Sequence, residues 1–271
     1  MDDFDRFLSE DLGKEGDITS NAIFSNEITE AAIISKESCI LAGLEESEQV
    51  FKRLGLKIEL KCKDGDYIKK EKIVAKIKGS VKNILKGERL ALNFLCRMSG
   101  IASETNKLVK KCRKINPNIS IAATRKTTPG FRKYEKKAVV IGGGETHRNG
   151  LFDQIMIKDN HIKALGSIGK AIKKIKEKDI KKLIEVEIEN EKDAITAAKL
   201  NVDVIMIDNL NLKSSEEISK KIRKINRDIL IEISGGINNK NIIKYAKFAD
   251  RISIGYLTHS IKSKNFSLEI L

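Results

Sequence analysis

The sequence has no tryptophan, only two prolines and few aromatic residues, which make up 5% of its 271 residues. So little proline argues against a proline-rich linker or a disordered tail. No apolar run approaches the roughly 20 residues that cross a membrane, and the acidic N-terminus does not resemble a signal peptide. With 41% hydrophobic residues the chain can build a sizeable core. We therefore expect a globular protein of the cytoplasm, without membrane association.

Cysteine and histidine are also scarce. The four cysteines, Cys39, Cys62, Cys96 and Cys112, form no C-x-x-C pair, so packed reduced thiols are the simplest interpretation. The three histidines lack the H-E-x-x-H spacing of zinc enzymes. No Ser–His–Asp or Cys–His pattern stands out, so covalent catalysis is not indicated.

Positive charge is abundant, because 52 lysines and arginines against 38 acidic residues give a net charge of +14. Such a balance is found in nucleic-acid-binding proteins. Few aromatic residues interleave with the lysines, however, so bases would lack stacking platforms. A lysine-rich solvated surface is the better interpretation, and we expect no nucleic-acid partner.

The two halves of the chain differ in pattern. Short apolar runs with turn signals between residues 30 and 80 predict strands, with a helix at 44–54 among them, and two long helices are expected at 81–98 and 101–115. After Pro117, apolar strands alternate with helical stretches. The expected strands are 118–123, 154–157, 183–186, 204–207, 229–233 and 251–254.

This alternation predicts a parallel sheet. We expect an N-terminal α+β sandwich domain at 1–115 and an incomplete, TIM-like β/α barrel of six to seven strands at 116–271. The last residues are expected to pack back on the N-terminal domain. An open doubly wound sheet is the alternative. Parallel barrels place their active sites at the carboxyl ends of the strands, and all six expected strands end in cations, carboxylates or glycines.

The last two strand ends are typical of a phosphate site. Ser234-Gly235-Gly236 permits close approach of backbone N–H groups, and a helix expected at 239–247 would add its positive end. Gly255 follows the neighbouring strand, with His259 nearby. Two ordinary turns are the alternative.

Glu187 and Asp208 end adjacent expected strands. Paired carboxylates facing an anion pocket suit a hard cation such as Mg²⁺, or ribose hydroxyls. A helix cap or a salt bridge to Lys158 is the alternative. Strand alternation places Glu185 and Glu189 on the same face as Glu187, which is preferred because it lies at the strand end.

The remaining strand ends supply cations. Arg125, Lys126 and Lys158 follow two strands, and His147 and Arg148 lie between them. Arginine matches carboxylate geometry and lysine suits phosphate, so this cluster predicts a pocket for a small polyanion. Gly142-Gly143-Gly144 does not match the dinucleotide fingerprint and is interpreted as a turn that presents His147.

Several motifs resemble, in order and spacing, those of the quinolinate phosphoribosyltransferase family. They are TRKTTPGFR, GGGETHRNGLFDQIMIKDNHI, EVEIEN, IMIDN, SGGI, IGYLTHS and, upstream, EDLGKEGDITS, LAGL and ERLALNFLCRMSGIAS. The resemblance covers nearly the whole chain. It implies transfer of phosphoribose from 5-phosphoribosyl-1-pyrophosphate to quinolinate, with release of pyrophosphate and CO₂ and formation of nicotinate mononucleotide for NAD synthesis. Another heteroaromatic acid such as nicotinate is the alternative substrate.

The resemblance also implies roles for particular residues and a homodimer, in which Arg89 reaches the partner's site. Quinolinate would be bound by Arg89, Thr124, Arg125, His147, Arg148 and Lys158. The phosphoribosyl group would be bound by Lys126, Ser234, Gly235, Gly236, Gly255 and His259. Catalysis would fall to Lys126, Lys158, Glu187 and Asp208, the last two also holding Mg²⁺ directly or through substrate or water. No tightly bound organic cofactor is expected.

Overall fold

The computed structural model describes residues 2–271, which form two compact units. The first unit contains residues up to 106 together with 137–142 and 260–271, and the second contains 107–136 and 143–259. The C-terminal segment therefore belongs with the N-terminal part of the chain. None of the helices in the described part of the chain is long and apolar enough to cross a membrane.

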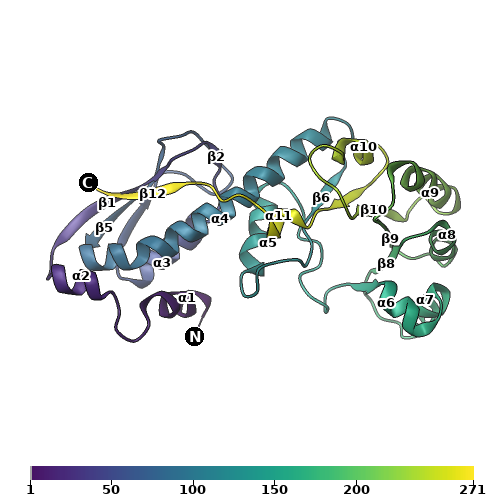
Figure 1. The fold of residues 1–271 in the computed structure, drawn as a ribbon, viewed down its shortest axis with the longest axis horizontal. Coiled ribbons are helices and arrows are strands. Elements are labelled where there is room, and N and C mark those ends of the chain that lie inside the picture. Colours follow the sequence, from purple (N-terminus) through teal and green to yellow (C-terminus); the bar gives the residue numbers. More distant parts are fainter. Residues whose placement is uncertain (1) are drawn as a thin grey trace. The chain divides into compact units, whose positions relative to one another are not determined.

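The first unit is built on a four-stranded antiparallel sheet with the strand order β12-β1-β5-β3 (Figure 1). The C-terminal strand β12 pairs with β1 along five residues. A two-stranded ribbon of β2 and β4 accompanies the sheet. The strands are β1 (Ile28–Ser35), β2 (Cys39–Ile40), β3 (Lys57–Leu60), β4 (Tyr67–Ile68), β5 (Ile73–Ser80) and β12 (Phe266–Ile270).

Helices complete the first unit. Side chains of Asp2 and Asp17 accept hydrogen bonds from the first-turn backbone of α1 (Asp3–Leu12) and α2 (Ile18–Ile23), which fixes where these helices begin. The expected helix at 44–54 is confirmed as α3 (Leu44–Arg53). Fully buried apolar side chains from the sheet and from helices α3 and α4 form the core, among them Ile33, Phe51, Ile77 and Phe94.

The two helices expected at 81–98 and 101–115 are one continuous helix, α4 (Val81–Arg113), so that prediction was wrong. Gly100 lies inside this helix and serves close packing, because a Cβ there would lie 2.6 Å from the carbonyl oxygen of Lys262. The neighbouring Ser99 hydroxyl donates to the Ala42 carbonyl at 3.1 Å. A small residue at this point admits another segment without interrupting the helix.

The second unit contains a six-stranded parallel sheet with the order β6-β11-β10-β9-β8-β7, which agrees with the predicted incomplete barrel. A single parallel bridge between Ala122 and Glu145 extends it beside β6. The strands are β6 (Ser120–Ala122), β7 (Ile155–Ile157), β8 (Ile184–Ile188), β9 (Val204–Asp208), β10 (Leu230–Ser234) and β11 (Arg251–Ser253).

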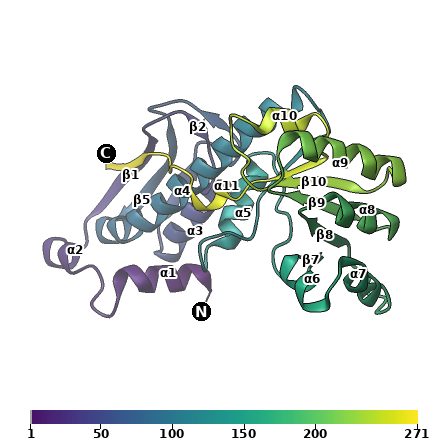
Figure 2. The same ribbon diagram turned by 45° about the vertical axis from the view of Figure 1, so that its right-hand side comes forward.

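Helices follow the strands, and α7, α8 and α9 lie along one side of the parallel strands in Figure 2. Side chains of Ser167, Asn190 and Asn211 cap their N-termini. The helices are α5 (Arg132–Ile141), which continues into the first unit, α6 (Asp159–Leu165), α7 (Ile168–Lys176), α8 (Glu191–Lys199), α9 (Leu212–Ile225), α10 (Ile242–Ala246) and α11 (Tyr256–His259).

One helix differs from the prediction in a way that affects the phosphate site. The helix expected at 239–247 is only five residues long and begins at Ile242. Asn238 and Asn241 hydrogen-bond each other's backbone N–H groups and so form a turn where the helix was expected to start. The helix therefore begins three residues later than predicted, and its contribution to phosphate binding at Ser234-Gly235-Gly236 stays a prediction.

Candidate active site

A cavity of about 410 Å³ lies at the carboxyl ends of the parallel strands, within the second unit. It is large enough for a small polar molecule. Most of the residues predicted for the site line it, although they come from six different segments. The lining residues are Ala123, Thr124, Arg125, Lys126, His147, Arg148, Met156, Lys158, Glu187, Met206, Asp208, Ser234 and Ser253.

Strand register explains why side chains from β8, β9 and β10 meet there. Glu187 pairs with Met206, and Met206 pairs with Glu232, so these three residues form one row across the sheet. Asp208 and Ser234 form the next row, two residues nearer the strand ends. Because alternate residues of a strand face the same side, both rows point to the same face.

Two arginines form the cationic side of the cavity. Arg148 is only 8% exposed, and the Nε of Arg125 is buried without a hydrogen-bond partner among residues 2–271. Burial lowers the pKa of Arg148, and the charge of Arg125 lowers it further. Neither guanidinium forms an ion pair within the described chain. A buried arginine and a half-buried one, both without an ion pair at the cavity wall, suit an external anion.

The carboxylate side of the cavity contains Glu187 and Asp208. Lys158 Nζ lies 2.7 Å from Glu187 Oε2, so the salt bridge considered as an alternative is present in this structure. Asn209 Nδ2 donates a hydrogen bond to Asp208 Oδ2 at 2.8 Å. Glu187 and Asp208 together offer two carboxylate ligands from neighbouring strands. Such a small set fits Mg²⁺, which takes few protein oxygens and completes its shell with water and substrate phosphates.

The predicted phosphate loop packs tightly against the end of β9. Gly235 has φ +79°, and a Cβ on it would lie 2.2 Å from Asn209 Oδ1 and 2.7 Å from Asn209 N. Glycine is therefore required there both for conformation and for space. At the next strand end, a Cβ on Gly255 would lie 3.1 Å from His259 Nε2 and 3.3 Å from Lys126 Cδ. The structure thus brings Gly255 and His259 beside a lysine that lines the cavity.

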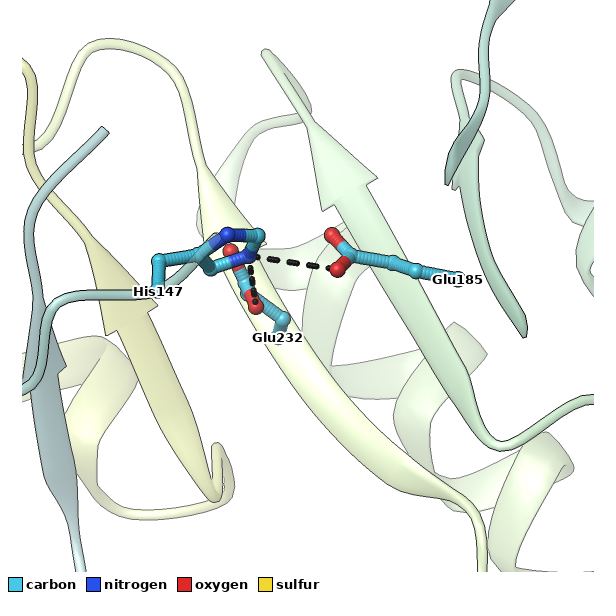
Figure 3. Close-up of side chains that lie close together, drawn as sticks. All are labelled: His147, Glu185 and Glu232. Carbon is cyan, nitrogen blue, oxygen red and sulfur yellow. Dashed lines mark ion pairs between the residues drawn. The ribbon is translucent and has the colours of Figure 1, made fainter. Parts of the chain in front are cut away.

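His147 makes contacts that the sequence did not reveal. Its Nε2 lies 3.2 Å from Glu185 Oε2 and 3.3 Å from Glu232 Oε2, and both carboxylates are fully buried (Figure 3). Burial raises the pKa of Glu185. Burial also acts to raise that of Glu232, but the bonds and charges of His147, Ser253 and Arg251 lower it below its usual value.

Strand alternation was the signal that could have found this cluster. Glu185 lies two residues before Glu187, and Glu232 lies two residues before Ser234, so each faces the barrel interior one step before the predicted site residue of its own strand. Their position away from the strand ends hid them. In residues 2–271 these three side chains are also the one set of three or more potential metal ligands that converge. Arg251 Nη1 lies 3.2 Å from Glu232 Oε2 and supplies positive charge there.

Arg89 lies on α4 in the first unit, with its side chain 68% exposed and 4.0 Å from that of Glu88. The cavity described above is formed within the second unit. The role that the resemblance implies for Arg89, in the site of a partner subunit, therefore stays a prediction.

Comparison with known proteins gives matches over most of the chain. The family model for the quinolinate phosphoribosyl transferase C-terminal domain matches residues 101–269, and that for the N-terminal domain matches residues 17–99. The chain is 43% identical to a probable nicotinate-nucleotide pyrophosphorylase [carboxylating] from Archaeoglobus fulgidus, over 94% of this chain and 98% of that protein. A protein of the same description from Bacillus subtilis is 41% identical, over 97% of this chain and 91% of its own.

The fold is similar to solved structures as well. NadC from Streptococcus pyogenes superposes with a TM-score of 0.90 at 39% identity, covering 99% of this chain and 95% of the other. This similarity includes both the antiparallel unit and the incomplete barrel. The fold prediction is thereby confirmed.

Proposed function

The chain belongs to the quinolinate phosphoribosyltransferase family, and we propose that its cavity binds quinolinate and 5-phosphoribosyl-1-pyrophosphate side by side. The protein is a pentosyltransferase of the carboxylating nicotinate-nucleotide pyrophosphorylase type and serves de novo NAD biosynthesis. The observation that carries this assignment is the buried Arg148 beside the half-buried Arg125, neither of which forms an ion pair among residues 2–271.

Quinolinate is a dicarboxylate, so it can neutralise both guanidiniums at once. Arg125 and Arg148 would bind its carboxylates through paired N–H donors, with Thr124 and Lys158 beside them. Met156 and Met206 offer apolar contact for the ring. Fixing both carboxylates orients the ring nitrogen toward C1 of the sugar, which is a positioning effect.

The chemistry then proceeds without a protein base. The ring nitrogen forms a bond to C1 of the ribose as the bond from C1 to pyrophosphate breaks. The positively charged ring next accepts the electron pair of the bond to the 2-carboxylate, which leaves as CO₂, and a proton from solvent takes its place. Carboxylates near the ribose favour the oxocarbenium-like transition state of the first step.

The phosphoribosyl group would lie along the other half of the cavity. Ser234, Gly235 and Gly236 would offer donors to the 5′-phosphate, and Gly255 and His259 would close on it from the next strand. Lys126 would contact the same substrate. When bound, Mg²⁺ neutralises the departing pyrophosphate. Glu187 and Asp208 would hold it, directly or through substrate or water.

We also propose a homodimer in which Arg89 completes the site of the partner. Leu151 and Phe152, which are 75% and 78% exposed, border a second hollow of about 610 Å³ that shares Arg125, Arg148 and Lys158 with the cavity. Large apolar side chains beside an active site mark a surface suited to association. The cytoplasmic location expected from the sequence stays a prediction.

Substrate choice tests this function. With 5-phosphoribosyl-1-pyrophosphate and Mg²⁺ present, we expect nicotinate mononucleotide to form from quinolinate with kcat/KM on the order of 100-fold or more above that for nicotinate, because nicotinate leaves one guanidinium unpaired. Both rates are measured by chromatography of the product. Faster turnover of nicotinate would favour the alternative enzyme. Tight, salt-sensitive binding of nucleic acid without turnover would instead indicate a basic nucleic-acid-binding protein.

A further inference from the structure

Both ring nitrogens of His147 lie against groups of the protein itself. Its Nδ1 accepts a hydrogen bond from the backbone N–H of Arg148 at 2.7 Å, and its Nε2 faces Glu185 and Glu232 (Figure 3). The side chain is 5% exposed. The Nδ1 bond places the ring proton on Nε2, the nitrogen that lies within ion-pair distance of both carboxylates. The contacts of His147 are therefore made with the protein, at the edge of the cavity.

The two carboxylates are themselves fixed from several directions. Glu232 accepts a hydrogen bond from the Ser253 hydroxyl and forms an ion pair with Arg251. Glu185 accepts a hydrogen bond from Gln154 Nε2 at 2.5 Å. Burial lowers the pKa of His147, and the carboxylates raise it to about 9, whereas the Arg148 N–H opposes a second ring proton on Nδ1. The cluster thus holds the ring in one place and one orientation.

A lysine holds the same segment from the other side. Lys136 is 2% exposed, and its Nζ donates to the carbonyl oxygen of Arg148 at 2.6 Å and to that of Thr146. These are the two residues that flank His147. Burial, followed by the charge of Arg132, lowers the pKa of Lys136 to about 8. An ammonium group in this place costs desolvation energy, which two carbonyl contacts offset only in part.

The segment needs such support because His147 has φ +51°, in the left-handed region. A residue with a Cβ persists in that region only where its surroundings hold it there. The residue that follows is Arg148, whose guanidinium lines the cavity. Any relaxation of His147 would redirect the backbone of Arg148 and move its side chain.

We propose that Lys136, Glu185 and Glu232 are positioning residues, which hold His147 in its left-handed conformation and thereby aim Arg148 at the dicarboxylate. This inference rests on the proposed function, since it takes quinolinate as the anion bound by Arg148. It assigns His147 an indirect part in binding and gives a task to three buried charged side chains that touch no substrate.

Glu232→Gln and Lys136→Met test the proposal, with Glu145→Gln as the matched control. Glu145 Oε2 lies 3.1 Å from Arg251 Nε, and within residues 2–271 Glu145 forms no hydrogen bond or ion pair with His147, so its replacement removes a carboxylate beside the same arginine. For each of the first two variants we expect KM for quinolinate to rise by on the order of 10-fold to 100-fold. We expect KM for 5-phosphoribosyl-1-pyrophosphate to stay within about twofold, and Glu145→Gln to change neither value.

A thermal unfolding curve for each variant establishes that it is folded. Lys136→Met keeps the length of the side chain without its charge, so it supplies the test if Glu232→Gln does not fold. An unchanged KM for quinolinate in both variants, or an equal rise for both substrates, would overturn the proposal. The wild-type protein is assayed alongside, and its failure to use quinolinate would overturn the proposed function instead.

Discussion

Arg148→Ala is expected to lower kcat/KM for quinolinate about 100-fold, because a charge-assisted contact to a buried carboxylate contributes about 1.5–3 kcal/mol. The guanidinium is buried and makes no ion pair within the described chain. Its removal therefore leaves no partner of its own unsatisfied, and we expect the folded state to be no less stable than wild type. Steady-state kinetics with each substrate varied in turn, together with thermal unfolding, would measure both effects.

Arg148→Lys provides the control for this prediction. Lysine keeps the positive charge and loses the planar fork, so its kcat/KM should fall between those of wild type and Arg148→Ala. The value of KM for 5-phosphoribosyl-1-pyrophosphate should change little in either variant. Near-normal kinetics of Arg148→Ala with quinolinate would remove Arg148 from the site.

Arg89→Ala and Asp208→Ala are each expected to be nearly inactive alone and to restore activity when combined in one dimer. The two variants are co-expressed with different affinity tags, and the heterodimer is isolated by two successive affinity steps. If Arg89 acts in the partner's site, one of the two sites in this dimer receives both intact residues. Its activity should then be about half that of the wild-type dimer.

The control is a heterodimer in which one subunit carries both substitutions and the other is wild type. If Arg89 acts in trans, a doubly substituted subunit paired with a wild-type one has no site with both residues. An inactive heterodimer of single variants, together with an active dimer of wild-type and double-variant subunits, would show that Arg89 acts within its own chain. Failure to recover any heterodimer would contradict the homodimer itself.

The sequence was most informative where residue pattern and position coincide. Six apolar runs separated by helical stretches predicted six parallel strands, and β6 to β11 occupy these places. Since all strands of a parallel sheet end at one edge, the residues that follow them had to lie close together. For this reason Arg125, Lys158, Glu187, Asp208 and Ser234, spread over more than 100 residues, could be expected in one cavity.

Packing decided the features that the sequence could not reveal. Two helices were expected at 81–98 and 101–115, but the lack of a side chain at Gly100 serves contact with another segment, and α4 continues through it. Lys136 reads as one of many surface lysines on a helix, yet its ammonium group is buried against carbonyl groups. Backbone carbonyls carry no residue signature, so such a contact cannot be anticipated from residue types.

The cluster of His147, Glu185 and Glu232 could be predicted from the sequence only in part. Its carboxylates could have been placed on the inner face of the barrel by alternation, but their convergence on one imidazole depends on the sheet register and on the loop that carries His147. The sequence also gave no sign that this residue has a positive φ. A role in direct binding of the anion was therefore expected, where the contacts in the structure favour an indirect one.

Release of CO₂ from quinolinate labelled at the 2-carboxylate tests the central claim most directly. With 5-phosphoribosyl-1-pyrophosphate and Mg²⁺ present, the account predicts labelled CO₂ in equal amounts with nicotinate mononucleotide and pyrophosphate, and none when the phosphoribosyl donor is omitted. Label that is retained in the product, or released without the donor, would contradict it.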